Sequence, residues 1–579
     1  MKKESRLALV GALLVLVSGF VAWRVQTDGG DVAIRDLRFA ASNGTVMSAL
    51  LYIPKTATAK TPAPAILAVH GYINSRETQD GFAIEFARRG YVVLALDQTG
   101  HGYSDPPAFA NGFGGPDGLA YLRSLNIVDK DNIGMEGHSM GGWTILAAAA
   151  TMPDAYKSMV LEGSSTGSGF AAEGTPTWPR NLAVVFSKHD EFAPLMWEVP
   201  RGSDAPNSAK LQKVFGATGP IEVGKVYGDV STGTARALFQ PNTTHPGDHI
   251  SKAAIGYAID WFGSTLQGGN HLPSSNQIWF WKELMTLVAF IGFIFIILGA
   301  GGSLLGTKTF GTLAKTLPEN KGTKGWGLWL GGAIGAAIPV LTYFSFFKIG
   351  ALLKPSAFWP QSITNQIMVW ALFNGAISLV LFLLWHFLSN KKKGAKAANY
   401  GLSLGFGEVL KTLVFSVLVL GAGALALGIA DYLFKIDFRF WVVALKPMSP
   451  LQFRIFLAYA LPFIAFFFVT SLAWNGELRP SGGKGLSTYF FAMFTAAGGF
   501  LVFLLIQYIP LLSGGTLFTA SEPLNVIVAI QFLPLMIVAA INSTWFYEKT
   551  GRIWAGAFVN GLFVAWYIVA GQATQFPIH

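Results

Sequence analysis

The amino-acid sequence predicts two structural classes in one chain, a mainly parallel α/β sheet domain and an all-α, multi-span transmembrane domain. Three observations predict this division. Only 13% of the 579 residues are charged, against roughly 25% in soluble domains, and mean hydropathy is +0.44, so much of the chain is expected in lipid. Short apolar runs alternate with helix-like segments up to about residue 270. Apolar stretches of roughly bilayer-spanning length then follow.

The first 28 residues are expected to form a retained signal-anchor helix. Three basic residues (Lys2, Lys3 and Arg6) precede an apolar run over 7–23, as in segments that are directed to a membrane. A cleaved signal peptide also needs a small-residue site of the A-x-A type, and "GFVAWRV" offers none. The anchor should therefore remain, with its N-terminus in the cytoplasm.

Residues 29–272 are expected to form the α/β domain. Nearly continuous apolar strands that alternate with helical segments are typical of a mainly parallel sheet with helices on both faces. The helical segments include "GFAIEFARRG" and "WTILAAAATMP". The predicted strands are "ALLYIP" (49–54), "AILAVHG" (65–71), "YVVLALD" (91–97), "NIGMEGH" (132–138), "SMVLEG" (158–163), "LAVVFSKHD" (182–190) and "RALFQ" (236–240).

The remaining residues, 273–579, are expected to form a membrane domain of about eight transmembrane helices. Each apolar stretch is close to the roughly 20 residues that an α-helix needs to cross a bilayer. Together with the anchor, the chain should cross the membrane nine times. The predicted spans lie near 284–305, 326–347, 366–388, 409–430, 451–474, 488–512, 522–541 and 553–571.

The positions of Lys and Arg predict the orientation in a cell membrane. Cytoplasmic loops carry an excess of these residues. If the anchor starts inside, the inner loops include the run "NKKKGAK" (390–396), while the α/β domain and the C-terminus lie outside. The outer loop at 431–450 fits least well, because it holds Lys435, Arg439 and Lys446.

This placement of lysines accounts for the net charge of +10, so we expect the lipid bilayer as a partner and no nucleic acid. The chain has no cysteine, which excludes a disulfide framework and a thiolate nucleophile. The spacing of His70, His101 and His138 does not indicate a metal site. We expect no metal and no other cofactor.

The stretch "GHSMG" (137–141) places Ser139 between two glycines, after a predicted strand and before a predicted helix. This pattern is the G-x-S-x-G nucleophile elbow, in which a tight turn exposes a reactive serine. Glycines are needed there because the turn brings backbone and helix close together. Ser139 is therefore the candidate nucleophile.

Upstream, "AVHGYINSRETQDGFAIEFARRGYVVLALDQTGHGYSD" (68–105) resembles the α/β-hydrolase superfamily. It has an HG turn after a strand, then a helix, then a strand that ends in D-x-x-G-x-G-x-S. The resemblance covers roughly residues 45–265 and implies an α/β hydrolase fold, similar to serine peptidase and esterase-like members that have no large cap. It assigns the oxyanion hole to the backbone N–H groups of Tyr72 and Met140.

A serine hydroxyl needs a base to take its proton, and the base needs an acid that orients it. The acid is expected after the strand at 182–188, which gives Asp190, with Glu162 at the end of the preceding strand as the alternative. His245 and His249 both lie before the last helix and compete as the base. We favour His245, because His249 lies at the N-terminus of that helix, where the helix dipole disfavours an imidazolium.

These residues predict a membrane-anchored serine hydrolase that cleaves an ester, thioester or amide bond through an acyl-enzyme intermediate. Its substrate would be a small-molecule or lipid-like acyl compound. The alternative is a membrane transporter or receptor that carries an accessory or inactive hydrolase domain.

Overall fold

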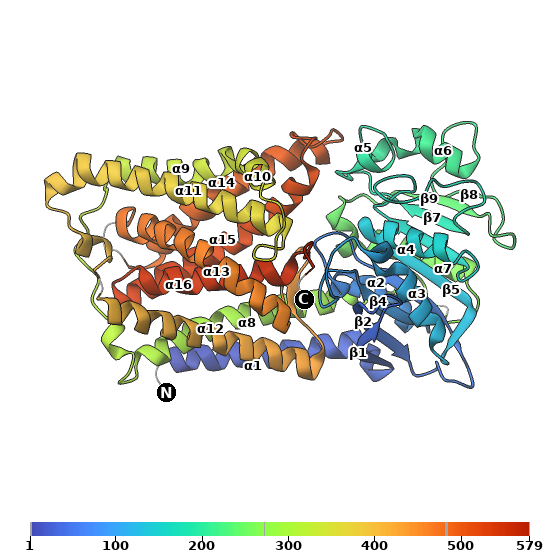
Figure 1. The fold of residues 1–579 in the computed structure, drawn as a ribbon, viewed down its shortest axis with the longest axis horizontal. Coiled ribbons are helices and arrows are strands. Elements are labelled where there is room, and N and C mark those ends of the chain that lie inside the picture. Colours follow the sequence, from blue (N-terminus) through green and yellow to red (C-terminus); the bar gives the residue numbers. More distant parts are fainter. Residues whose placement is uncertain (1–2, 271, 404, 481–483, 578–579) are drawn as a thin grey trace.

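The computed structural model describes residues 3–270, 272–403, 405–480 and 484–577. The chain has two parts that lie end to end (Figure 1). One is a bundle of long helices, formed by α1 and α8–α16. The other, called here the sheet domain, comprises β1–β9 with α2–α7 and lies at one end of the bundle.

The sheet domain holds a nine-stranded sheet in the order β1-β2-β4-β3-β5-β6-β7-β9-β8. The run from β4 to β9 is parallel, and β1, β2 and β8 add antiparallel edges. This confirms the mainly parallel sheet. The strands are β1 (Val32–Ala40), β2 (Val46–Pro54), β3 (Ala63–Val69), β4 (Val92–Asp97), β5 (Val128–His138), β6 (Ser158–Glu162), β7 (Leu182–Val185), β8 (Val226–Tyr227) and β9 (Arg236–Phe239).

Each predicted strand corresponds to an observed one, and two edge strands were missed. The sequence of β1 is "VAIRDLRFA", and its charged residues Arg35, Asp36 and Arg38 are exposed. The continuous apolar run that marks a buried strand is therefore absent. In β8 only two residues pair with β9. Edge strands need no continuous apolar sequence, which is why the pattern overlooked them.

Helices cover both faces of the sheet, because each face is lined by apolar side chains. Apolar residues of α3 and α4 pack against one face, and those of α2 and α7 pack against the other. The short α5 and α6 lie beside the β7–β9 edge (Figure 1). The helices are α2 (Asp80–Arg88), α3 (Gly115–Ser124), α4 (Met140–Thr151), α5 (Ala193–Met196), α6 (Ala209–Phe215) and α7 (Lys252–Thr265).

In the bundle, eight helices of the described residues are long and apolar enough to cross a membrane, and a bent pair makes a ninth candidate. Each predicted span corresponds to one helix, except 326–347, which bends by 45° at Thr342. The span predicted at 522–541 ends too early, because its helix continues to Thr550. Pro339 lies one turn earlier and cannot donate a helix hydrogen bond. The helices are α1 (Lys3–Gln26), α8 (Trp279–Leu305), α9 (Trp326–Leu341), α10 (Tyr343–Gly350), α11 (Ser362–Trp385), α12 (Phe406–Phe434), α13 (Pro450–Ser471), α14 (Leu486–Leu512), α15 (Pro523–Thr550) and α16 (Trp554–Gly571).

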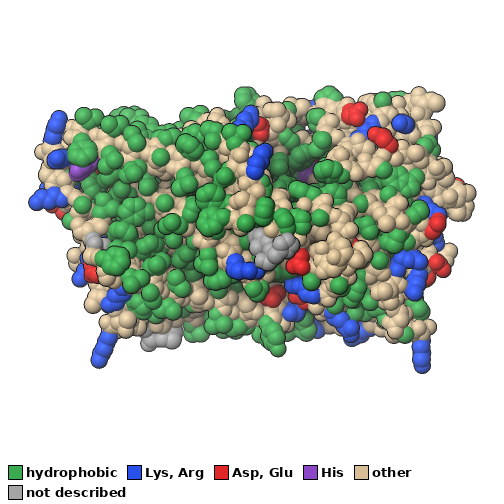
Figure 2. All heavy atoms as spheres, in the orientation of Figure 1, with side chains coloured by type: hydrophobic (Ala, Val, Ile, Leu, Met, Phe, Trp, Pro, Cys, Tyr) green, Lys and Arg blue, Asp and Glu red, His purple; other side chains and the backbone are tan. Residues whose placement is uncertain are grey.

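The basic loops gather at the end of the bundle that is remote from the sheet domain. Asn320 donates to the backbone of Arg479, and Lys549 pairs with Glu4 at the start of α1. Lys and Arg side chains mark this end in Figure 2, and hydrophobic side chains cover the bundle between its two ends. The bundle is thus apolar along its sides and charged at its far end, a pattern expected of helices that could cross a bilayer.

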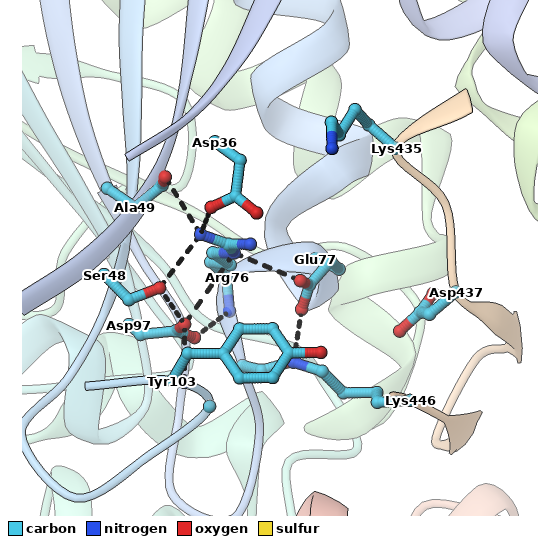
Figure 3. Close-up of polar contacts among 12 residues, drawn as sticks. Asp36, Ser48, Ala49, Arg76, Glu77, Asp97, Tyr103, Lys435, Asp437 and Lys446 are labelled. Atoms are coloured by element: carbon cyan, nitrogen blue, oxygen red, sulfur yellow. Dashed lines mark hydrogen bonds and ion pairs between the residues drawn. The ribbon is translucent and has the colours of Figure 1, made fainter. Parts of the chain in front are cut away.

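A buried ion cluster joins the two parts of the chain (Figure 3). Glu77 of the sheet domain accepts hydrogen bonds from Lys446 of the bundle at 2.6 Å and from Arg76 at 3.1 Å. Arg76 also donates to Asp36 at 2.7 Å, and Arg439 Nη2 lies 3.8 Å from Glu77 Oε2. Although burial opposes ionisation, Lys446 and Arg76 hold the pKa of Glu77 well below its usual range.

This cluster holds two of the three cations that make the loop at 431–450 a poor fit to the charge rule. The loop forms a small antiparallel hairpin of β10 (Phe438–Phe440) and β11 (Val443–Leu445), the one β element between the described spans. Arg439 pairs with Asp437 and Lys446 pairs with Glu77, and all four side chains are buried. Cations that are paired inside the protein do not act as solvent-facing topology signals.

A second buried ion pair links α2 to α8 and yields a prediction. Lys282 bonds to Asp80, which also accepts the Tyr52 hydroxyl at 2.7 Å. Lys282→Met should leave the buried Asp80 carboxylate without its cation and destabilise the protein by about 3–5 kcal/mol. The measurement is the thermal midpoint in detergent. Adding Asp80→Asn should restore most of the loss, and a double variant no more stable than Lys282→Met would refute this explanation.

Candidate active site

Ser139 lies on the turn between β5 and α4, with φ 54° and ψ −122°. A non-glycine residue with positive φ is strained, and such strain is typical of a nucleophile elbow. The structure also shows why Gly141 follows. A Cβ at Gly141 would lie 2.1 Å from the carbonyl oxygen of Val69 in the neighbouring strand. The strand–turn–helix context that the sequence predicted is present, and the Ser139 side chain is partly exposed.

The structure brings His245 and Asp190 together. His245 Nδ1 lies 2.9 Å from Asp190 Oδ2, and Asp190 Oδ1 accepts the backbone N–H of Phe192 at 2.7 Å. Asp190 follows β7, and His245 precedes the short helical turn 246–250. Because Nδ1–H donates to the carboxylate, the imidazole keeps its free lone pair on Nε2.

Ser139 and His245 line the same cavity, but the described contacts include no hydrogen bond between the Ser139 hydroxyl and His245. Burial lowers the pKa of His245 to about 4, so its imidazole is neutral at pH 7. A neutral imidazole beside a partly exposed serine is the protonation state that a general base needs.

The two alternative residues lack equivalent partners. His249 lines the cavity, but neither of its ring nitrogens has a described hydrogen-bond partner, and its ring lies 4.1 Å from that of His138. Ser251 caps α7 by accepting the N–H of Ala254, which places His249 two residues before the helix cap. Both carboxylate oxygens of Glu162 are also without a described hydrogen-bond partner, so Glu162 orients neither histidine.

Tyr72 and Met140 lie on either side of Ser139. Met140 is the first residue of α4, so its N–H has no acceptor within the helix. Tyr72 follows Gly71, where a Cβ would approach Ser139 Cβ to 3.1 Å. Both residues line the cavity with Ser139. The Tyr72 hydroxyl points elsewhere and accepts a hydrogen bond from Gln575 at 2.9 Å.

The D-x-x-G-x-G-x-S segment holds loops together and lines no part of the cavity. Asp97 accepts the backbone N–H groups of Arg76 at 2.8 Å and Tyr103 at 3.0 Å. Gly100 has φ 68°, and a Cβ there would lie 2.6 Å from the carbonyl oxygen of Thr574. Thr574 follows the last helix, and its backbone bonds to Gly100 O and Ala108 N, both at 2.8 Å.

The cavity at Ser139 has a volume of about 320 Å³ and is walled by both parts of the chain. The sheet domain supplies most of the wall, including the aromatic rings of Tyr72, Trp143 and Phe192. The bundle closes the opposite side. Its contribution, which sequence reasoning missed, consists of Trp441, Val442, Leu524, Ile527 and Gln531.

The bundle also contacts the loop that carries His245. Trp441 Nε1 donates to the carbonyl oxygen of Pro246 at 2.6 Å. Glu191 accepts the backbone N–H of His245 at 2.7 Å and the hydroxyl of Tyr508, from α14, at 2.9 Å. One signal was available in the sequence: "FRFWVVAL" is unusually apolar for a loop between two spans. Nothing indicated which part of the fold it would cover.

Comparison with known proteins identifies the sheet domain. Residues 64–191 match the family described as alpha/beta hydrolase fold, a range that includes Ser139 and Asp190 and ends before His245. Uncharacterised proteins of Mycobacterium bovis and Mycobacterium tuberculosis are 29% identical over 181 residues, which is 29% of this chain and 44% of theirs. The chain thus matches less than half the length of these relatives.

Solved structures that are similar to the sheet domain include two esterases. The match to an esterase from Rhodococcus sp. has 24% identity and covers 24% of this chain and 47% of the esterase chain, with a TM-score of 0.20. The match to an esterase of Pyrococcus furiosus has 14% identity and covers 42% of this chain and 96% of the esterase chain, with a TM-score of 0.31.

Proposed function

We propose, from the premise that the sheet domain has the α/β-hydrolase fold, that this protein is a membrane-anchored serine hydrolase. The single observation that supports this most strongly is the buried His245–Asp190 pair beside the strained Ser139 elbow. The reaction would be cleavage of an ester, thioester or amide bond. This arrangement favours an enzyme over a transporter or receptor with an inactive hydrolase domain.

In the proposed mechanism, the Ser139 hydroxyl oxygen attacks the substrate carbonyl carbon while His245 Nε2 takes the hydroxyl proton. Asp190 accepts the Nδ1–H and stabilises the imidazolium that forms. When the tetrahedral intermediate collapses, the bond to the leaving group breaks and His245 returns the proton to that group. Water then attacks the acyl-enzyme, again with His245 as base, and releases the acid and free Ser139.

The negative charge on the tetrahedral intermediate needs preorganised donors. The N–H groups of Tyr72 and Met140 are the proposed pair, because both residues border Ser139. The N-terminus of α4 adds its dipole at Met140. Since these donors are backbone groups, the side chains of Tyr72 and Met140 serve mainly to shape the cavity.

The first prediction for this function concerns covalent labelling by a fluorophosphonate probe. The purified protein should be labelled, and Ser139→Ala should not. His245→Ala should slow labelling and ester turnover by on the order of 10³-fold or more, because the serine loses its base.

His249→Ala is the matched control, and its labelling rate and ester turnover should fall only mildly, since His249 has no acid partner. Undiminished labelling of Ser139→Ala would refute the nucleophile. A larger loss in His249→Ala than in His245→Ala would reassign the base to His249. Absence of labelling in the unsubstituted protein would favour an inactive domain.

The second prediction concerns pH. Protonation of His245 removes the base, and burial holds its pKa near 4 in the free protein. Activity should therefore persist through pH 5 and fall only as the pH approaches about 4. The measurement is kcat/KM for a short ester from pH 3.5 to 8, because kcat/KM reports groups of the free enzyme. Recovery at pH 7 is the control for unfolding, and half-maximal activity near pH 6.5 would contradict the prediction.

The third prediction concerns orientation. The basic loops lie at the far end of the bundle, so the charge rule favours a cytoplasmic location for that end and an extracytoplasmic sheet domain. The chain has no cysteine, so single cysteines can be introduced without background. In sealed right-side-out vesicles, a membrane-impermeant maleimide should label Lys213→Cys in α6 but not Lys392→Cys in the lysine loop. The opposite labelling pattern would invert the topology.

A further inference from the structure

The mouth of the Ser139 cavity is unusually apolar for a domain that meets water. Phe109, Phe170 and Leu195 line this cavity and are 40%, 79% and 49% exposed. They are half of the large hydrophobic side chains that are strongly exposed on the described residues of the sheet domain, the others being Val46, Val223 and Val226. Exposed hydrophobic groups that cluster at one site mark a binding surface.

The cavity lining carries no Lys, Arg, Asp or Glu side chain among the described residues. Its polar groups are those at the reactive centre (Ser139 and the histidines) and a few uncharged side chains such as Asn74, Thr78 and Gln531. A site that recognised a phosphate or carboxylate next to the scissile bond would need a fixed cation. The lining therefore suits an uncharged hydrocarbon portion of a substrate.

The cavity lies at the level where the bundle meets the sheet domain. Its bundle-side wall includes Leu524 and Ile527 from the first two turns of α15, which begins at Pro523. Figure 2 shows a hollow between the two parts of the molecule, bordered by hydrophobic side chains and with a histidine inside it. The end of a membrane-spanning helix lies near the bilayer surface, so this hollow faces the lipid–water boundary.

We propose that this cavity is the acyl-chain site for a lipid ester that reaches Ser139 directly from the bilayer. The hydrocarbon chain lies against Leu524, Ile527 and the aromatic rings, and the carbonyl meets Ser139. A charged headgroup, where the lipid has one, stays outside the cavity. This inference rests on the proposed function, because it assigns the substrate class of the same serine.

The cavity has a defined inner end, which limits the chain length. Gln531 lines both this cavity and a smaller apolar one of about 30 Å³ within the bundle, whose walls include Trp370 and Phe532. Gln531 Oε1 accepts the hydroxyl proton of Tyr567 at 2.7 Å. This hydrogen-bonded pair places a polar group at the residue that the two spaces share.

A series of p-nitrophenyl esters from butanoyl to octanoyl tests the acyl site in the purified full-length protein. With monomeric substrates, kcat/KM should rise by up to about fourfold for each added methylene, equivalent to about 0.8 kcal/mol per buried CH₂. Leu524→Trp fills the cavity from the bundle side and should lower the octanoyl-to-butanoyl ratio at least tenfold. The ratio cancels losses that come from partial misfolding.

Ile509→Trp is the matched control, since Ile509 is 58% exposed on α14 and lines no part of the cavity. It should keep the ratio of the unsubstituted protein. The acyl site would be overturned if kcat/KM did not change with chain length, or if the octanoyl-to-butanoyl ratio fell equally in both variants. Either result would leave the serine hydrolase intact. No turnover of any ester, together with no fluorophosphonate labelling, would overturn the proposed function and this inference with it.

Proteoliposomes test the route from the bilayer. With a long-chain diacylglycerol in the membrane, the rate of fatty-acid release should follow its mole fraction in the bilayer at constant bulk concentration. Diluting it with inert phospholipid should therefore slow the reaction. A rate that follows only the bulk concentration would show delivery from water and refute access from the bilayer.

Discussion

The arrangement of the active-site cavity depends on one buried carboxylate, Glu77. Its side chain is shared between Arg76 of its own domain and Lys446 of the bundle. Removing one partner of such a buried pair strongly destabilises the fold, because no water can solvate the charge that remains. The ion cluster therefore fixes the position of the loop at 71–78 against the hairpin at 438–445. These two segments supply facing walls of the cavity, so its shape follows from the ion pair.

The bundle takes the place of the cap that the sequence lacks. The segment between β6 and β7 is short, as expected for hydrolases without a large cap. Trp441 and the start of α15 instead cover Ser139 from the membrane side. Hydrogen bonds from Trp441 to Pro246 and from Tyr508 to Glu191 also hold the His245 loop. The helices are thus part of the wall around Ser139.

The turn at Ser139 was predictable because it is local: five adjacent residues specify it, and the Cβ contact at Gly141 explains one of them. Asp190 followed from chain order after a recognisable strand. The preference for His245 over His249 came from the position of His249 just before the last helix, and in the structure that helix begins at Lys252. The bundle side of the cavity was not predictable, because Leu524 and Ile527 belong to an apolar helix. In sequence, a leucine that faces a cavity looks the same as one that faces lipid.

The backbone contacts of Thr574 with Gly100 and Ala108 impose an order on biosynthesis. All strands and helices of the sheet domain have been made once α7 is translated, but its loop at 98–108 lacks the backbone of Thr574 until about 300 further residues have been translated. At about 5–20 residues per second, that interval is about 15–60 s. During it, every helix from α8 to α16 must be translated before the loop beside Tyr72 is closed. The closed form of this loop therefore exists only after α16 has been translated, so a ribosome-bound nascent chain carries the sheet domain with one loop still open.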